Sequence, residues 1–154
     1  MALLHPLVPE HVRSTTELRV RFCDTDLMGV VHHSNTFAYF EMGRVEWLRR
    51  RGLSYREWSD RGLHFAVVEA YAKYRSPARF DDLLTVEVIL TELRPASLRL
   101  EYRIFRSDVL IADGGTRHAC VDNAGHLQRL SKELIAVLQR PELEPKPVEL
   151  VPRP

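Results

Sequence analysis

The chain has 154 residues, of which 45% are apolar and 28% are charged, a balance typical of one globular domain with an apolar core. The formal net charge is only +1 and the longest basic run is three arginines at 49–51, so the composition does not favour binding to nucleic acid. No window approaches the ~18 apolar residues of a membrane span, and the first residues do not resemble a secretory signal.

The first predicted element is a strand over residues 17–24, because apolar and polar side chains alternate along it. Its inward-facing residues would be Leu18, Val20 and Phe22. A turn containing Gly29 follows. The stretch CDTDLMGVVHHSN, residues 23–35, holds two aspartates and two adjacent histidines, and it leads directly into a helical pattern. This polar stretch is the strongest candidate for a functional site.

A long helix is predicted from about Thr36 to Gly52, with Ser or Asn as its N-cap and glycine at its end. Glu41 and Arg44 fall in the same sector as its apolar residues. They would form a partly buried ion pair, or Glu41 would point its carboxylate into a pocket between helix and sheet. A short second helix is expected over residues 55–61. The residues that the helical period places on this apolar side of the long helix are Phe37, Phe40, Trp47 and Leu48.

From there the apolar period changes to two, which predicts four strands. The last strand contains Gly114 and Gly115, the expected site of a bulge. One long helix needs an apolar surface to cover, and the strands supply it. The fold class is therefore α+β: a single domain in which one long helix lies on a strongly curved antiparallel sheet. The four strands are expected over residues 64–77, 83–90, 97–105 and 109–122.

The tail from Pro141 onward holds five of the nine prolines and is not expected to be helical. We assign residues 1–15 to an N-terminal extension, 16–140 to the domain and 141–154 to this proline-rich tail. The two cysteines, Cys23 and Cys120, form no spaced motif. Reduced thiols and a cytoplasmic location are the expectation, because disulfides persist mainly in oxidising compartments.

Three interpretations of residues 23–35 compete. A metal site would use the carboxylates and histidines as ligands, but D-x-D and H-H lack the spacing of known zinc motifs, so no metal is expected. A structural interpretation lets Asp24 or Asp26 accept turn N–H groups while the histidines cap the helix, and for Asp24 this is the favoured account. A hydrolytic interpretation pairs a carboxylate nucleophile or base with the free N–H groups of the helix N-terminus, which hold an oxyanion.

The strings D-T-D-x-x-G-V-V-x-H, from Asp24, and F-E-x-x-R-x-E-W-L, from Phe40, resemble the signature of the 4-hydroxybenzoyl-CoA thioesterase family. The likeness is greatest to the branch of bacterial acyl-CoA thioesterases found with the Tol–Pal cell-envelope system. A second stretch, Y-R-S-P-A-R-F-D-D-L-L-T-V-E from Tyr74, is similar to that family's second motif. The resemblance spans residues 17–138 and implies a hotdog fold that works as a homodimer or a tetramer, with active sites at the subunit interface.

The resemblance also implies roles for particular residues. The catalytic aspartate falls on Asp26, as nucleophile or general base, and the motif histidine falls on His33, whose backbone N–H would be an oxyanion donor. Glu41 matches an acidic helix position that faces the acyl pocket in some members. Arg94 matches an arginine that meets the phosphates of coenzyme A. His32 is assigned to substrate binding, at a position where relatives carry tyrosine.

The chain departs from the pattern at several positions. Phe22 replaces a tyrosine four residues before Asp26, so no phenol acts there. Pro95 and Ala96 replace the basic cluster after the phosphate-binding arginine, so Arg75 or Arg79 is a candidate to contact coenzyme A instead.

These features predict an acyl-CoA thioesterase that needs no cofactor beyond the coenzyme A of its substrate. The substrate could equally be carried by acyl carrier protein. A non-catalytic acyl-CoA or acyl-carrier-protein binding module is the alternative, although binding alone needs neither Asp26 nor His33. A hotdog enoyl-CoA hydratase fits less well, because such enzymes place Asp and His about five residues apart. Asp26 lies six residues before His32 and seven before His33.

Overall fold

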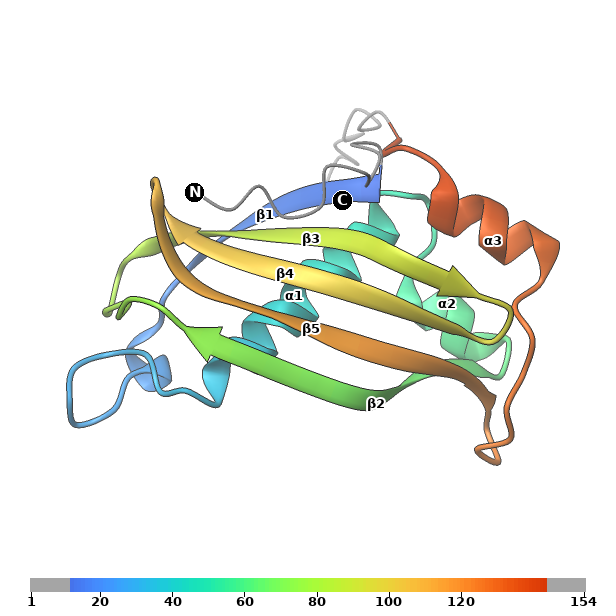
Figure 1. Cartoon of the computed structure of the whole chain (residues 1–154), viewed down its shortest axis with the longest axis horizontal. Helices are drawn as coiled ribbons and strands as arrows, with labels where there is room; N and C mark the ends of the chain where they lie inside the picture. The colour runs from blue at the N-terminus through green and yellow to red at the C-terminus, as the bar shows by residue number, and fades with distance from the viewer. Residues whose placement is uncertain (1–11, 144–154) are drawn as a thin grey trace, which may run out of the picture.

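The structure, a computed structural model, describes residues 12–143; the rest of the predicted extension and tail lies outside this range. Five strands form one antiparallel sheet in the order β1-β3-β4-β5-β2 (Figure 1). The strands are β1 (Arg13–Arg19), β2 (Leu63–Tyr74), β3 (Leu83–Arg94), β4 (Ser97–Arg106) and β5 (Val109–Asp122). The helices are the 3-10 helix η2 (Phe22–Asp24), α1 (Asn35–Arg49), α2 (Tyr55–Asp60) and α3 (Lys132–Gln139).

Helix α1 crosses one face of the curved sheet, while the loop after η2 and helix α3 lie at opposite ends of it (Figure 1). The inward face of α1 buries Phe40, Trp47 and Leu48 as the helical period predicts. At Gly43 the helix approaches β3 so closely that a Cβ would lie 2.8 Å from methyl groups of Val86 and Val88. The expected single α+β domain, one long helix on a curved antiparallel sheet, is confirmed.

Strands β3 and β4 supply the apolar surface under α1. Alternate residues are buried along β4, whereas on β3 Glu87 and Ile89 of the opposite face are buried as well. The predicted inward faces of both strands are the ones observed. The buried residues of these inward faces are Leu84, Val86, Val88 and Leu90 on β3 and Leu98, Leu100, Tyr102 and Ile104 on β4. This sheet face and α1 form the core against which the candidate site is built.

The first strand differs from its prediction. Strand β1 begins earlier, at Arg13, and ends at Arg19, after which the chain turns into η2. Phe22 is therefore not buried: its side chain is 79% exposed and its ring meets the edge of Phe80. The alternation of apolar and polar residues extends beyond the end of β1, so the sequence pattern alone predicted a longer strand. The contacts of Asp24, described below, belong to the turn that follows the strand, and a local pattern cannot reveal them. Phe37, expected on the inward face of α1, is also partly exposed.

The irregularities of the sheet also fall elsewhere than predicted. The pairing of β5 with β4 shifts at Ile111, and that of β2 with β5 shifts at Val68, whereas Gly114 and Gly115 pair regularly. Gly114 is needed for space instead, because a Cβ there would lie 2.2 Å from the Tyr71 carbonyl oxygen and 2.9 Å from the Phe40 ring. Helix α3 was not expected; Ser131 caps it by accepting the N–H of Leu134.

Candidate active site

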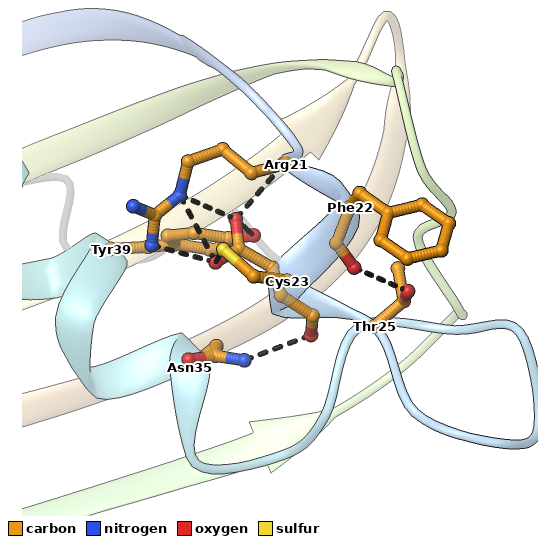
Figure 2. A network of polar contacts seen from close by, with 7 residues as sticks. Arg21, Phe22, Cys23, Thr25, Asn35 and Tyr39 are labelled. Atoms are coloured by element: carbon orange, nitrogen blue, oxygen red, sulfur yellow. Dashed lines mark hydrogen bonds and ion pairs between the residues drawn. The ribbon is translucent and has the colours of Figure 1, made fainter.

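The buried Asp24 carboxylate fixes the beginning of the polar stretch. It accepts the backbone N–H of Arg21 at 3.0 Å, a guanidinium N–H of Arg21 at 2.8 Å and the hydroxyl of Tyr39 at 2.9 Å. The Asn35 side chain donates to the Asp24 carbonyl oxygen (Figure 2). Burial alone would raise the pKa of Asp24, but the hydrogen bonds from Arg21 and Tyr39 hold it below its ordinary value. Asp24 thus ties the loop to α1, as the structural interpretation predicts.

Asp26 is held by its own turn. Its Oδ1 accepts the N–H of Met28 at 2.8 Å, and its backbone N–H donates to the carbonyl of Val30. Gly29 closes the turn with φ +73°, a backbone conformation that favours glycine. No hydrogen bond within residues 12–143 reaches Oδ2 of Asp26. The carboxylate is therefore oriented through one oxygen, and the other is available to a ligand.

The two histidines precede α1 and make different contacts. The backbone N–H of His32 donates to the Asp24 carbonyl at 2.9 Å, and its Nδ1 lies 3.2 Å from the N–H of Ser34. The carbonyl of His33 accepts the hydroxyl of Tyr74 at 3.0 Å. The backbone N–H of His33 makes no hydrogen bond to any of residues 12–143. No side chain caps α1 at Ser34, but the N–H groups of Asn35 and Thr36 donate to the carbonyls of His32 and His33. Among residues 12–143, the unpaired donor at the start of the helix is therefore the His33 N–H.

Asp26 and His33 line one cavity of about 400 Å³, formed by the loop, the first turns of α1 and residues of β2, β3, β4 and β5, whereas the predicted substrate-binding residue His32 is not part of its lining. Its apolar part includes Leu84, Ile104 and Ala112. Arg75 lies at this cavity and is held by Asp113, with 2.8 Å between Nε and Oδ2. The polar lining residues are Asp26, His33, Thr36, Tyr39, Tyr74 and Arg75. A negative group, a free N–H and apolar walls thus converge at one place.

Two other predicted residues lie away from this cavity within one chain. Glu41 is exposed and pairs with Arg44 at 3.4 Å, beside a second cavity of about 220 Å³. Both expectations for it are therefore met in part: it forms an ion pair, and it lines a pocket. Arg94 pairs with Glu92 at the far end of β3. Ten residues of extended strand separate it from Leu84 at the Asp26 cavity, on the order of 30 Å.

Sequence patterns did not single out Thr36, Tyr39 and Tyr74. Tyr39 follows Asn35 by one helical turn, so both side chains reach back to Asp24. The spacing of four residues between them is the sequence feature from which this contact could have been predicted. Tyr74 is the last residue of β2 and the first of the second motif, but the motif gave it no role at the site. Within residues 12–143, no group of three or more His, Cys, Asp or Glu side chains is placed to hold a metal ion. Cys23 and Cys120 are both free thiols.

Comparison with known proteins gives the family. The profile of the thioesterase-like superfamily matches residues 20–150. The acyl-CoA thioesterase YbgC of Haemophilus influenzae is 33% identical over 106 residues, which cover 68% of this chain and 78% of that protein. A crystal structure of a hypothetical protein from Thermus thermophilus superposes with a TM-score of 0.80 at 39% identity, covering 86% of this chain and 99% of that one.

A crystal structure of 4-hydroxybenzoyl-CoA thioesterase in complex with 4-hydroxybenzoyl-CoA superposes with a TM-score of 0.76, covering 82% of this chain and 99% of that one, and at 20% identity it supports the fold alone. The chain belongs to the thioesterase-like superfamily. The expected hotdog fold and the expected enzyme class, a thioester hydrolase, are confirmed by these matches. No helix within residues 12–143 is long and apolar enough to cross a membrane.

Proposed function

We propose that this protein hydrolyses an acyl-CoA thioester to the free acid and coenzyme A, with Asp26 as the catalytic carboxylate. The observation that carries the proposal is that Asp26, with one oxygen free, lines the same cavity as His33, whose backbone N–H is unpaired among residues 12–143. Acyl transfer needs these two elements together, a nucleophile or base and a donor where negative charge develops.

In the proposed reaction the thioester carbonyl oxygen lies at the His33 N–H and the first turn of α1. The helix dipole and this donor stabilise the oxyanion, and one preorganised donor typically contributes about 3–4 kcal/mol to such a step. Asp26 Oδ2 either attacks the carbonyl carbon, giving an anhydride that water then opens, or takes a proton from the attacking water. Collapse of the tetrahedral intermediate expels the coenzyme A thiolate. Asp26, water and the substrate supply every proton and electron pair, so no resident cofactor enters.

The second oxygen of Asp26 is kept in place by neighbours that do not react. The Met28 N–H donates to Oδ1 of Asp26. Two residues earlier, Asp24 anchors the chain through its contacts with Arg21 and Tyr39. Tyr74 donates to the His33 carbonyl and so fixes the peptide at the helix start. We assign Arg75, together with His32, to contacts with the substrate beyond the thioester.

We propose further that two copies assemble through the free edge of β2, with higher assemblies built from this dimer. Strand β2 ends the sheet, spans 12 residues and exposes Val67 and Val68, 50% and 59% accessible. A long apolar edge strand of this kind is unstable in isolation and pairs readily with another strand. In such an assembly, Arg94, on the order of 30 Å from the Asp26 cavity of its own chain, can meet a substrate only at another subunit's cavity.

The test is thiol release from a panel of thioesters. The panel runs from short aliphatic to aromatic acyl-CoAs, with the same acyl groups on acyl carrier protein and on pantetheine. Hydrolysis of at least one acyl-CoA with turnover, proportional to enzyme, supports the proposal. Stoichiometric binding of acyl-CoA without any thiol release would instead support the binding-module alternative. Faster hydrolysis of the carrier-protein thioesters would identify acyl carrier protein, in place of coenzyme A, as the carrier of the substrate's acyl group. The proposal also includes a cytoplasmic location for this assembly, since acyl-CoA is found there.

A further inference from the structure

The Asp26 cavity and the second cavity lie on either side of one pair of stacked rings. Helix α1 contributes Thr36 to the Asp26 cavity and Arg44 to the second cavity. Phe40 lies midway between them, four residues from each, and so points to the same face of the helix. The Phe40 side chain is fully buried.

The sheet repeats this order. On β4, Ile104 lines the Asp26 cavity and Leu100 lines the second one, with Tyr102 between them on the same strand face. On β5, Ala112 and His118 line the two cavities, and Gly114, which pairs with Tyr102, lies between. On each of α1, β4 and β5, one residue therefore lies between the residues that line the two cavities: Phe40, Tyr102 and Gly114.

The middle residues are packed into a wall. The rings of Phe40 and Tyr102 stack with centroids 4.3 Å apart and planes 12° from parallel. The Phe40 ring lies so close to Gly114 that a Cβ there would stand 2.9 Å from it. The Tyr102 hydroxyl is fixed from the second-cavity side by Thr116, at 2.6 Å, and Thr116 in turn meets His118 Nε2 at 2.7 Å.

The second cavity is built mainly of apolar side chains. Its lining includes Trp47, Leu48, Phe65, Leu98, Leu100 and Leu138. The Glu41–Arg44 ion pair lies at it, and the hydroxyl–imidazole chain of Tyr102, Thr116 and His118 satisfies most of its polar atoms internally. A hydrocarbon chain that passed the ring pair would thus meet apolar surface.

We propose that the Phe40–Tyr102 pair sets the length limit of the acyl group, and that the cavity behind it becomes an extension of the acyl pocket when the pair is opened. The inference rests on the proposed function, because it assumes that an acyl group enters beside Asp26. Phe40 to Arg44 is one helical repeat, so opening the wall deepens the pocket by about 6 Å. Each methylene group newly buried there would raise affinity about fourfold.

The experiment compares kcat/KM across saturated acyl-CoAs, from butyryl-CoA to palmitoyl-CoA, for the wild type and two variants. Phe40→Leu removes the stacked ring and keeps an apolar side chain. Leu138→Ala is the matched control, because it enlarges the second cavity from its far side and leaves the wall intact. In Phe40→Leu the ratio of kcat/KM for long to short chains rises at least about tenfold, whereas in Leu138→Ala it stays within about twofold. An unchanged ratio in Phe40→Leu, or equal changes in both variants, overturns the proposal.

A second measurement does not require hydrolysis. In a Trp58→Phe background, Trp47 is the single tryptophan and lines the second cavity. Titration with S-alkyl-CoA thioethers of increasing length changes Trp47 fluorescence in Phe40→Leu, only for the long chains, and not in its Phe40 parent. An equal response in both proteins would mean that ligands reach the cavity past Glu41 and Arg44, and no response in either would mean that the cavity is not reached; both overturn the proposal. If no acyl-CoA is hydrolysed by the wild type but Trp47 responds as expected, the proposed function fails and the partition stands.

Discussion

Buried His118 makes the stability of the fold depend on pH in a defined window. Its side chain is 1% exposed, and burial, reinforced by the charge of Arg44, lowers the pKa of His118 from 6.5 to about 4. As the pH falls through 6.5 the unfolded chain takes up a proton here, while the folded chain stays neutral until about 4. Protons therefore favour unfolding across this window, and stability present above pH 6.5 is lost toward pH 4. The loss is about 3 kcal/mol.

Equilibrium urea unfolding, followed by far-UV circular dichroism at one protein concentration, measures this loss. The wild type and His118→Gln are compared at about pH 7.5 and about pH 4.5, where the histidine contributes about 2–3 kcal/mol of the wild type's decrease. Asp24, whose pKa is lowered, adds acid sensitivity of the same sign to both proteins and cancels in the comparison. The decrease is smaller in His118→Gln by that amount. Equal decreases in the two proteins would refute the reasoning.

Three further substitutions test the packing and the assembly. Tyr39→Phe removes the hydroxyl that donates to the buried Asp24 carboxylate, so the free energy of unfolding falls by about 1.5–3 kcal/mol in denaturant titration. Gly43→Ala places a methyl group 2.8 Å from Val86 and Val88, and overpacking by about 1–3 kcal/mol outweighs the gain in helix propensity, which lowers Tm in calorimetry. Val67→Lys puts a charge on the exposed β2 edge, and light scattering then shows a smaller assembly than the wild type; an unchanged mass would remove β2 from the interface.

The repetitive elements could be predicted from the sequence because their signal is local. The 3.6-residue period of α1 and the two-residue period of β3 and β4 each bury a continuous face, so pattern and structure agree there. Helix α3 was not predicted because it has only eight residues, too few to show a clear helical period. Its buried residues are Leu134 and Leu138. The bulge at Ile111 leaves no residue-type signal. Of the two glycines that suggested a bulge, Gly114 leaves room for the Phe40 ring and Gly115 leaves room for the Tyr71 ring.

The candidate site could be predicted only where a motif carried it. The motif placed Asp26, His32 and His33 in one loop, and the structure has Asp26 and His33 at one cavity. It could not place Tyr74, which comes from a strand end 41 residues after His33 in sequence and meets it only through the fold. The match to family positions also singled out Glu41 and Arg94, which lie away from the Asp26 cavity of their own chain.

The central claim is that Asp26, and not Asp24, is the catalytic carboxylate, and kcat/KM of Asp26→Asn beside Asp24→Asn tests it most directly. In Asp26→Asn the amide oxygen still accepts the Met28 N–H, so Tm stays near the wild-type value while kcat/KM falls by about 10²–10⁴-fold or more. Asp24→Asn weakens the contacts to Arg21 and Tyr39, so Tm falls, yet below that Tm its kcat/KM stays within about tenfold of wild type. Near-wild-type turnover in Asp26→Asn, or an equal loss in folded Asp24→Asn, would contradict the account.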